Sequence, residues 1–237
     1  MTDERPLISL LVPAFNEART IEAVLRRAAA VDLRTEIVVV DDGSSDGTPE
    51  IAERVAAELD PERLRVVRHG SNQGKGAAVR TGLGAVRGEF VVIQDADLEY
   101  DPRDLPKLVG PLLEGIADVV YGSRLRGGEP QRAHLFWHYA GNRFLSLLTN
   151  ILFNTTISDM EVGYKAFRTD LVRSIELTSR GFGIEPEITA KLLRLGDVRL
   201  YEIPISYYGR TYEEGKKITW RDGVTAVVLL LRFRFAR

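Results

Sequence analysis

The chain has 237 residues, of which 44% are hydrophobic and 28% charged, and its formal net charge at pH 7 is -2. This near-neutral balance argues against a nucleic-acid-binding protein, which is usually strongly basic or carries a basic stripe. The sequence contains no cysteine, which excludes disulfides, thiolate metal sites and a cysteine nucleophile. Its length fits one large domain with a sizeable core.

The N-terminal residues 1–6 are polar and lead directly into an expected strand, a pattern unlike that of a signal peptide. No apolar run approaches the roughly 20 residues that a membrane-spanning helix needs. The nearest candidate, residues 224–231, is too short. We therefore expect a cytoplasmic protein, or one that works on the cytosolic face of a membrane.

Strands and helices are expected to alternate through the first hundred residues. Apolar runs at 7–12, 36–40, 64–68 and 90–93 predict strands, and apolar residues at helical spacing follow the first three of them, the first helix having Thr20 as its N-cap. Such alternation is typical of βαβ units, a parallel sheet and right-handed crossovers. No internal repeat or linker interrupts the chain, so we expect a single domain.

Carboxylates follow two of these strands, at residues 41–48 and 94–99. Asp95 and Asp97 are two residues apart, so in an extended backbone both side chains point the same way. Oxygen ligands at a strand end suit Mg²⁺ or Mn²⁺, held by few protein groups and completed by substrate phosphates. Taken alone, the pattern is also typical of a solvated turn.

Two other polar segments have simpler interpretations. Gly74-Lys75-Gly76 matches neither a Walker A loop nor a dinucleotide-binding loop, and leaves either a tight turn or a helix N-terminus whose lysine helps to bind an anion. Glu185 and Glu187 are expected in the first turn of a helix, where the helix dipole favours acidic residues.

The second half of the chain predicts strands at 117–121 and 200–206 and a long, aromatic helix over 134–152. Core packing is the plain interpretation of these aromatic residues, and an apolar groove for a lipid or another large acceptor is the alternative. Residues 207–217 are basic, aromatic and without periodicity, which indicates a flexible lid.

Six motifs, in order, resemble those of inverting family 2 glycosyltransferases with the GT-A fold, and among them the dolichyl- or polyprenyl-phosphate sugar synthases. The resemblance implies a Rossmann-like, mostly parallel sheet flanked by helices, in a domain over residues 1–217 with a nucleotide-binding half (about 1–125) and an acceptor half (about 126–217). Residues 218–237 would form a C-terminal amphipathic helix. The motifs are Val12-Pro13-Ala14-Phe15-Asn16-Glu17, Val40 to Thr48, Asp95-Ala96-Asp97-Leu98-Glu99, Gly122-Ser123-Arg124, Ser158-Asp159 with Gly163, and Glu202-Ile203-Pro204-Ile205, followed by residues 210–216.

The resemblance also assigns expected roles to individual residues. The donor nucleotide would contact Pro13, Phe15, Glu17, Val39, Asp41, Asp95, Ala96 and Asp97. The metal ligands would be Asp95, Asp97 and Glu99, the last replacing a frequent Gln with a better cation ligand. Phosphates would be bound by Arg124, Arg210 and Lys216, and the catalytic residues would be Asp97, Arg124 and Asp159.

The function implied is metal-dependent transfer of mannose or glucose from GDP-mannose or UDP-glucose to a polyprenyl or dolichyl phosphate, in one in-line displacement with inversion. A phosphate acceptor is already ionised, whereas a sugar hydroxyl would need a general base, for which Asp159 is the first candidate. The C-terminal tail, in which apolar residues stand beside Arg232, Arg234 and Arg237, would either lie on a membrane surface or membrane partner, or complete the core.

Three alternatives compete with this function. A soluble family 2 enzyme would act on a sugar hydroxyl or a small-molecule acceptor. A non-catalytic nucleotide-sugar-binding protein is disfavoured because it would be expected to lose the metal acids, which are all present. A sugar nucleotidyltransferase is disfavoured because no glycine- and arginine-rich loop follows the first strand.

Overall fold

The computed structural model describes residues 8–60, 62–133, 135–211, 213–215, 217 and 219–235. The alternation of strands and helices expected from the sequence is confirmed. The elements are β1 (Ile8–Ala14), α1 (Ile21–Ala29), β2 (Thr35–Asp41), α2 (Thr48–Leu59), β3 (Leu64–Arg68), α3 (Lys75–Ala85), β4 (Phe90–Ile93), η1 (Pro102–Asp104), α4 (Leu105–Leu113), β5 (Val119–Ser123), α5 (Phe136–Phe153), β6 (Lys165–Arg168), α6 (Thr169–Ser174), α7 (Ile184–Arg194), β7 (Leu200–Pro204) and α8 (Trp220–Phe235).

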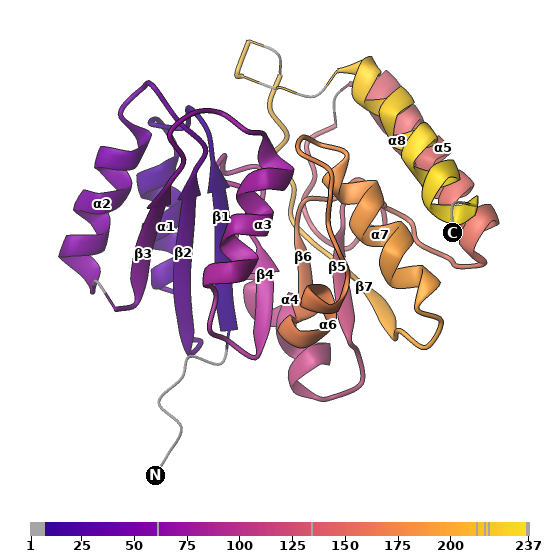
Figure 1. The fold of residues 1–237 in the computed structure, drawn as a ribbon, viewed down its shortest axis with the longest axis horizontal. Coiled ribbons are helices and arrows are strands. Elements are labelled where there is room, and N and C mark those ends of the chain that lie inside the picture. Colours follow the sequence, from indigo (N-terminus) through magenta and orange to yellow (C-terminus); the bar gives the residue numbers. More distant parts are fainter. Residues whose placement is uncertain are drawn as a thin grey trace.

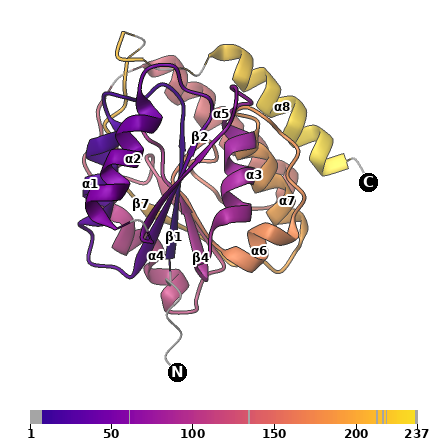
Figure 2. The same ribbon diagram turned by 60° about the vertical axis from the view of Figure 1, so that its left-hand side comes forward.

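Seven strands form one sheet in the order β3-β2-β1-β4-β6-β5-β7 (Figure 1). Neighbouring strands are parallel except for β6, which is antiparallel to both β4 and β5. Helices α1 and α2 cover one face of the sheet, and α3, α6 and α7 cover the other (Figure 2). This is the predicted Rossmann-like, mostly parallel sheet in a single domain.

The central strands are continuous apolar runs because both of their faces are covered. Every residue of β1, β2 and β4 is buried, as expected for parallel strands between two helical layers. On α1 the buried residues Ile21, Val24, Leu25 and Ala28 share one side of the helix, which packs on the sheet.

Thr20 occupies the expected N-cap position of α1, but its side chain makes no capping hydrogen bond. Its hydroxyl instead donates to the carbonyl of Ala96 at 2.7 Å. The N-cap position is therefore confirmed, but the side chain of Thr20 joins the start of α1 to the turn that follows β4.

The strand order reverses at β1, whose two neighbours are β2 and β4. The ladder between β1 and β4 ends at Leu11 and Ile93, whereas β1 continues beside β2 through Pro13 to Ala14. Pro13 is tolerated there because that edge of β1 is no longer paired with β4. The expected end of the strand at residue 12 was too early, and a crevice opens at the carboxyl ends of β1 and β4, the usual ligand position in such sheets.

The antiparallel direction of β6 brings the segment that precedes it to the same crevice. Lys165, the first residue of β6, pairs with Ile93 of β4 and Tyr121 of β5. Since β6 starts where β4 ends, residues 158–164 lie beside the carboxylates that follow β4.

Helix α8 packs against α5 and α7, at the side of the molecule away from α1 and α2 (Figure 1). Ala226, Leu230 and Phe233 are its buried residues. This spacing forms one stripe along the helix, so part of the tail does complete the core. None of the described helices is long and apolar enough to cross a bilayer.

Candidate active site

A cavity of about 420 Å³ lies at the carboxyl ends of the strands, where the sheet order reverses. It is lined by most of the residues expected at the donor and phosphate sites, namely Pro13, Phe15, Glu17, Asp95, Ala96, Asp97, Glu99, Arg124 and Arg210. Three expected site residues, Val39, Asp41 and Asp159, are buried and are not part of its lining. Lys216 lies outside the described residues.

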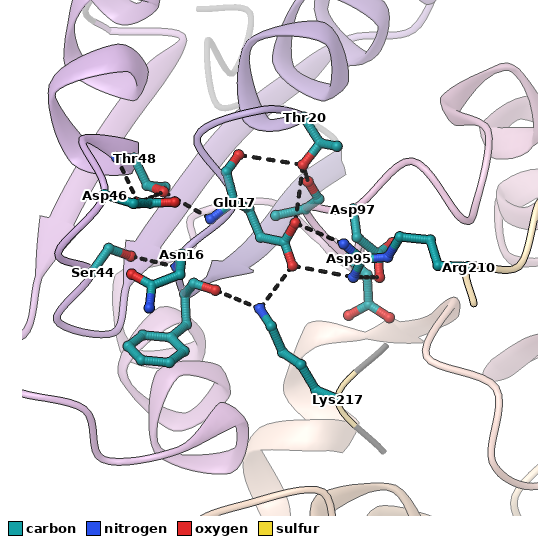
Figure 3. Close-up of polar contacts among 12 residues, drawn as sticks. Asn16, Glu17, Thr20, Ser44, Asp46, Thr48, Asp95, Asp97, Arg210 and Lys217 are labelled. Carbon is teal, nitrogen blue, oxygen red and sulfur yellow. Dashed lines mark hydrogen bonds and ion pairs between the residues drawn. The ribbon is translucent and has the colours of Figure 1, made fainter. Parts of the chain in front are cut away.

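The loop after β1 is held by the loop after β2 (Figure 3). Backbone N–H groups of residues 16–18 donate to the side chains of Ser44, Thr48 and Asp46 at distances between 2.8 and 3.0 Å. The Asp-Gly-Ser-Ser-Asp-Gly-Thr motif therefore fixes the backbone of the loop after β1, which carries Glu17.

Arg210, which follows β7, contacts carboxylates of the loops after β1 and β4 (Figure 3). Its guanidinium lies 3.0 and 3.1 Å from the two carboxylate oxygens of Glu17 and 2.8 Å from Oδ2 of Asp97. Its backbone N–H donates to Oε1 of Glu99 at 2.7 Å. Lys217 adds a second cation, 2.8 Å from Glu17. Arg210 and Lys217 thus bind the carboxylates of Glu17 and Asp97 in the cavity lining.

The two aspartates that follow β4 bind different cationic partners. The strand ends at Ile93, Leu98 has a φ of 61°, and Oδ1 of Asp97 accepts the N–H of Glu99 at 3.0 Å. Asp95 pairs with Lys75 at 2.7 Å. The shared strand face was expected only while the backbone stays extended, and that condition is not met, because the chain turns at residues 96–97.

Among the described residues, no three acidic or histidine side chains lie close enough together to form a metal site. The expected trio of Asp95, Asp97 and Glu99 is therefore not gathered. Burial, followed by repulsion from Asp95 and Glu99, raises the pKa of Asp97 to about 7. A divalent cation that takes part of its coordination from a diphosphate would relieve this repulsion between Asp97 and its acidic neighbours.

Arg124, at the end of β5, is positioned by a completely buried carboxylate. Asp159 accepts from its Nε and Nη2 at 2.7 Å each and from its backbone N–H at 2.9 Å. Asn142 donates to the same carboxylate at 2.6 Å. Burial opposes ionisation of Asp159, but the hydrogen bonds and charge of Arg124 leave its pKa below the usual range. Asp159 is thus committed to Arg124, which lines the cavity.

A chain of ion pairs runs from the cavity lining to the buried Lys165, and sequence reasoning missed it. Lys75 lies 2.7 Å from Asp95 and 3.0 Å from Glu185, and Glu185 also pairs with the fully buried Lys165. Lys75 therefore serves as a partner for carboxylates of two different elements. Neither the tight turn nor the helix-dipole interpretation anticipated this link, since the partners are about 20 to 110 residues apart in sequence.

Glu187 also does more than complement the dipole of α7. It accepts the backbone N–H groups of Thr178 and Ser179 at 2.9 and 2.6 Å, and pairs with Lys191 at 2.7 Å. Glu187 therefore fixes the segment that leads into α7, and this segment borders the cavity.

Core packing was the wrong interpretation of the aromatic residues of α5. The exposed fractions of Phe136, Trp137 and Phe144 are 67%, 81% and 57%. Along α8 a second apolar stripe is exposed, on the side opposite its buried residues. It consists of Trp220, Val224, Val228, Leu231 and Phe235. These residues of α5 and α8 are called the apolar face below.

The fold and the cavity together define a glycosyltransferase of the GT-A class. The sequence model described as "Glycosyl transferase family 2" matches residues 9–175. An undecaprenyl-phosphate mannosyltransferase of Micrococcus luteus is 34% identical over 220 residues, covering 87% of this chain and 85% of that protein. A polyprenol monophosphomannose synthase of Mycolicibacterium smegmatis is 30% identical over 207 residues, covering 85% and 77%.

Solved structures are also similar to this chain. Glucosyl-3-phosphoglycerate synthase of Mycobacterium tuberculosis, in complex with Mn²⁺ and UDP-glucose, superposes with a TM-score of 0.75 at 25% identity, over 97% of this chain and 79% of that one. The chain belongs to glycosyltransferase family 2, and the resemblance seen in its motifs is confirmed.

Proposed function

We propose that the protein transfers a hexose, mannose or glucose, from a nucleotide-sugar donor to a polyprenyl phosphate. The observation that carries this proposal is the cluster of Glu17, Asp97 and Glu99 around Arg210, in one cavity with Arg124. Carboxylates suit nucleoside hydroxyls and a divalent cation, and guanidinium groups suit phosphate oxygens. The names of two relatives supply the acceptor class.

The chemistry is a single displacement with inversion. An ionised oxygen of the acceptor phosphate attacks the anomeric carbon, the bond from that carbon to the diphosphate breaks, and the electron pair leaves with the nucleoside diphosphate. A divalent cation held by Asp97 and Glu99, with Mn²⁺ or Mg²⁺ as candidates, supplies positive charge for the departing diphosphate. No general base is required, which agrees with the commitment of Asp159 to Arg124.

The cations of this chain act on the phosphates. Arg124 is held rigidly by Asp159 and stacks over the ring of Tyr207 at 5.1 Å, so its fork is oriented before substrate arrives. When the donor enters, Arg210 would release the carboxylates of Glu17 and Asp97 and bind diphosphate oxygens instead. Residues 207–217 would then close over the bound donor, which excludes water from the reacting carbon.

The apolar face gives a lipid acceptor a route to the cavity. Trp137 on α5 and Trp220 on α8 are 81% and 75% exposed, and α5 and α8 pack together. Arg221, Arg232 and Arg234 lie on the same α8 helix, where guanidinium tips reach anionic head groups while the apolar residues enter the interface. We infer that this face lies on the cytosolic membrane surface, where the acceptor phosphate is presented.

A small-molecule acceptor is the second candidate, since a structural neighbour is named for a phosphoglycerate product. A soluble phosphate ester would use the same ionised oxygen and the same arginines. It would give no function to the apolar face, however, and for that reason we rank it below the lipid.

The test is transfer of radiolabel from GDP-mannose and from UDP-glucose, with Mn²⁺, to a polyprenyl phosphate and, separately, to 3-phosphoglycerate. We expect label in the organic phase with one donor only, which also identifies that donor. Label in the phosphoglycerate product with none in the lipid would replace the proposal by the second candidate. Binding of donor without transfer to either acceptor would redirect the search to hydroxyl acceptors.

A further inference from the structure

Residues 158–163 form a turn whose backbone is fixed from several sides. Met160 and Val162 direct their carbonyls to the buried ammonium of Lys165, and the N–H of Gly163 donates to the hydroxyl of Tyr100 at 3.1 Å. A Cβ on Gly163 would lie 2.3 Å from Oδ2 of Asp95, so the turn packs directly on the floor of the cavity. The N–H groups of Ser158, Asp159 and Met160 donate to the side chains of Glu202 and Ser146.

Glu161, between the two carbonyls that bind Lys165, is the exception in this turn. It lines the cavity, and its Oε1 is buried without a hydrogen-bond partner among the described residues. Each of the other carboxylates of the cavity lining accepts a hydrogen bond or joins an ion pair; they are Glu17, Asp42, Asp95, Asp97, Glu99 and Glu185.

A buried carboxylate oxygen without a donor is costly, so its presence in the cavity lining calls for a ligand that supplies one. Burial is also the main reason that the pKa of Glu161 rises to about 7. Lys165 and Arg124 place positive charge around this carboxyl, while Glu185 and Asp159 place negative charge, so the surroundings favour a charged ligand of neither sign. An anion is also disfavoured because an ionised Glu161 only accepts hydrogen bonds. A neutral polyol, with several hydroxyl donors, fits both conditions.

We propose that Glu161 accepts hydrogen bonds from the hydroxyl groups of the transferred sugar and thereby selects among hexoses. This inference rests on the proposed function, which brings a nucleotide-linked hexose into the cavity. Glu161 and Arg124 line one cavity with Asp97, so a diphosphate bound by Asp97 and Arg124 places its sugar within the space that Glu161 borders. Because a carboxylate rejects a sugar that lacks the matching hydroxyl, Glu161 is a specificity-determining residue.

The experiment measures binding by calorimetry in Mn²⁺, using GDP, GDP-mannose, UDP and UDP-glucose with the wild-type protein and with Glu161→Gln. We expect the nucleoside diphosphate to bind both proteins within about twofold. The nucleotide sugar should bind Glu161→Gln about 10- to 100-fold more weakly, as for loss of a hydrogen bond to a charged group. Glu114→Gln, an exposed carboxylate on the α4 side, is the matched control for loss of one charge.

A second measurement changes the ligand and compares the same two proteins. Donor analogues that lack one sugar hydroxyl each should show a single position, or two adjacent ones, at which the wild-type protein loses that affinity, and Glu161→Gln should be insensitive to the same deletion. Equal weakening of diphosphate and nucleotide sugar by Glu161→Gln, or equal sensitivity of both proteins to every deletion, would overturn the inference. Failure of the wild-type protein to bind any nucleoside diphosphate would overturn the proposed function itself, and this inference with it.

Discussion

Asp159 holds Arg124 in a two-pronged ion pair, with both prongs at 2.7 Å, and the carboxylate is completely buried. The geometry makes the aspartate a positioning residue: it is bonded to the arginine and to Asn142, and it does not line the cavity. Arg124 does line the cavity, so the pair transmits the rigidity of the protein interior to a phosphate-binding cation.

A double-mutant cycle tests this relationship. Because the two residues act as a unit, Arg124→Ala and Asp159→Ala should each lower kcat/KM by about 100-fold or more, and the double variant should lose little beyond the worse single one. Asp159→Ala should also unfold at lower denaturant, since an unpaired buried arginine costs about 3–5 kcal/mol. Losses that multiply in the double variant would indicate that Asp159 has an independent catalytic role.

Arg210→Ala should change metal and donor affinity in opposite directions. Without the guanidinium, Asp97 and Glu17 lose a cation that competes with Mn²⁺, so metal alone should bind about 10-fold more tightly. The nucleoside diphosphate should bind about 10-fold more weakly, because a charge-assisted contact is lost. Calorimetric titrations of both ligands measure this, with the exposed Arg168→Ala as control. Weakening of both affinities would show that Arg210 only supports the fold.

Membrane attachment is tested by flotation with liposomes that contain anionic lipid. The wild-type protein should float with them, and a variant with Trp137→Ala and Trp220→Ala should partition at least about 10-fold less, because each indole contributes on the order of 2 kcal/mol when buried. Both side chains are exposed, so thermal stability should not change. Ile116→Ala, exposed on another side of the molecule, should leave flotation unaltered. Flotation that survives loss of both tryptophans would exclude this face as the attachment site.

The carboxylate of Glu187 predicts a specific acid sensitivity. Burial opposes its ionisation, but Lys191 and Ser179 outweigh burial and lower the pKa of Glu187 to about 2. Since the folded pKa is lower than the unfolded one, its stabilisation is complete above the unfolded pKa of about 4.3 and is lost as pH falls towards 2. Glu187→Gln should cost about 1–3 kcal/mol near neutral pH and show a smaller loss on acidification. Denaturant unfolding at several pH values measures both; parallel pH curves would contradict the assignment.

The sheet was predictable because its information is local. Apolar runs such as 36–40 and 90–93 signal strands without knowledge of their neighbours, and the alternation with helices then implies a parallel sheet. The place of the site followed as well, since carboxylates after such strands meet at one edge. What the sequence did not show was that β4 ends before Asp95, because a turn stabilised by Asp97 and Glu99 competes with extended backbone.

The missed features depend on pairings across the chain. Nothing local indicates that Lys75 bridges Asp95 and Glu185, or that Asp159 is occupied by Arg124. The exposure of Trp137 was misjudged for a related reason: helical spacing identifies an apolar side but not whether another element covers it. Glu161 carried no signal beyond its place beside Asp159, since its lack of a partner is visible only in the folded chain.

Organic-phase label transfer in a matched set of proteins tests the central claim most directly. The wild-type protein, Asp97→Ala and the exposed control Asp170→Ala would be assayed with labelled nucleotide sugar and polyprenyl phosphate, with Mn²⁺ or with EDTA. The account predicts label in the lipid for the wild type and Asp170→Ala only, its abolition by EDTA, and at least about a 1000-fold loss in Asp97→Ala. Lipid labelling that persists in EDTA or in Asp97→Ala would contradict it.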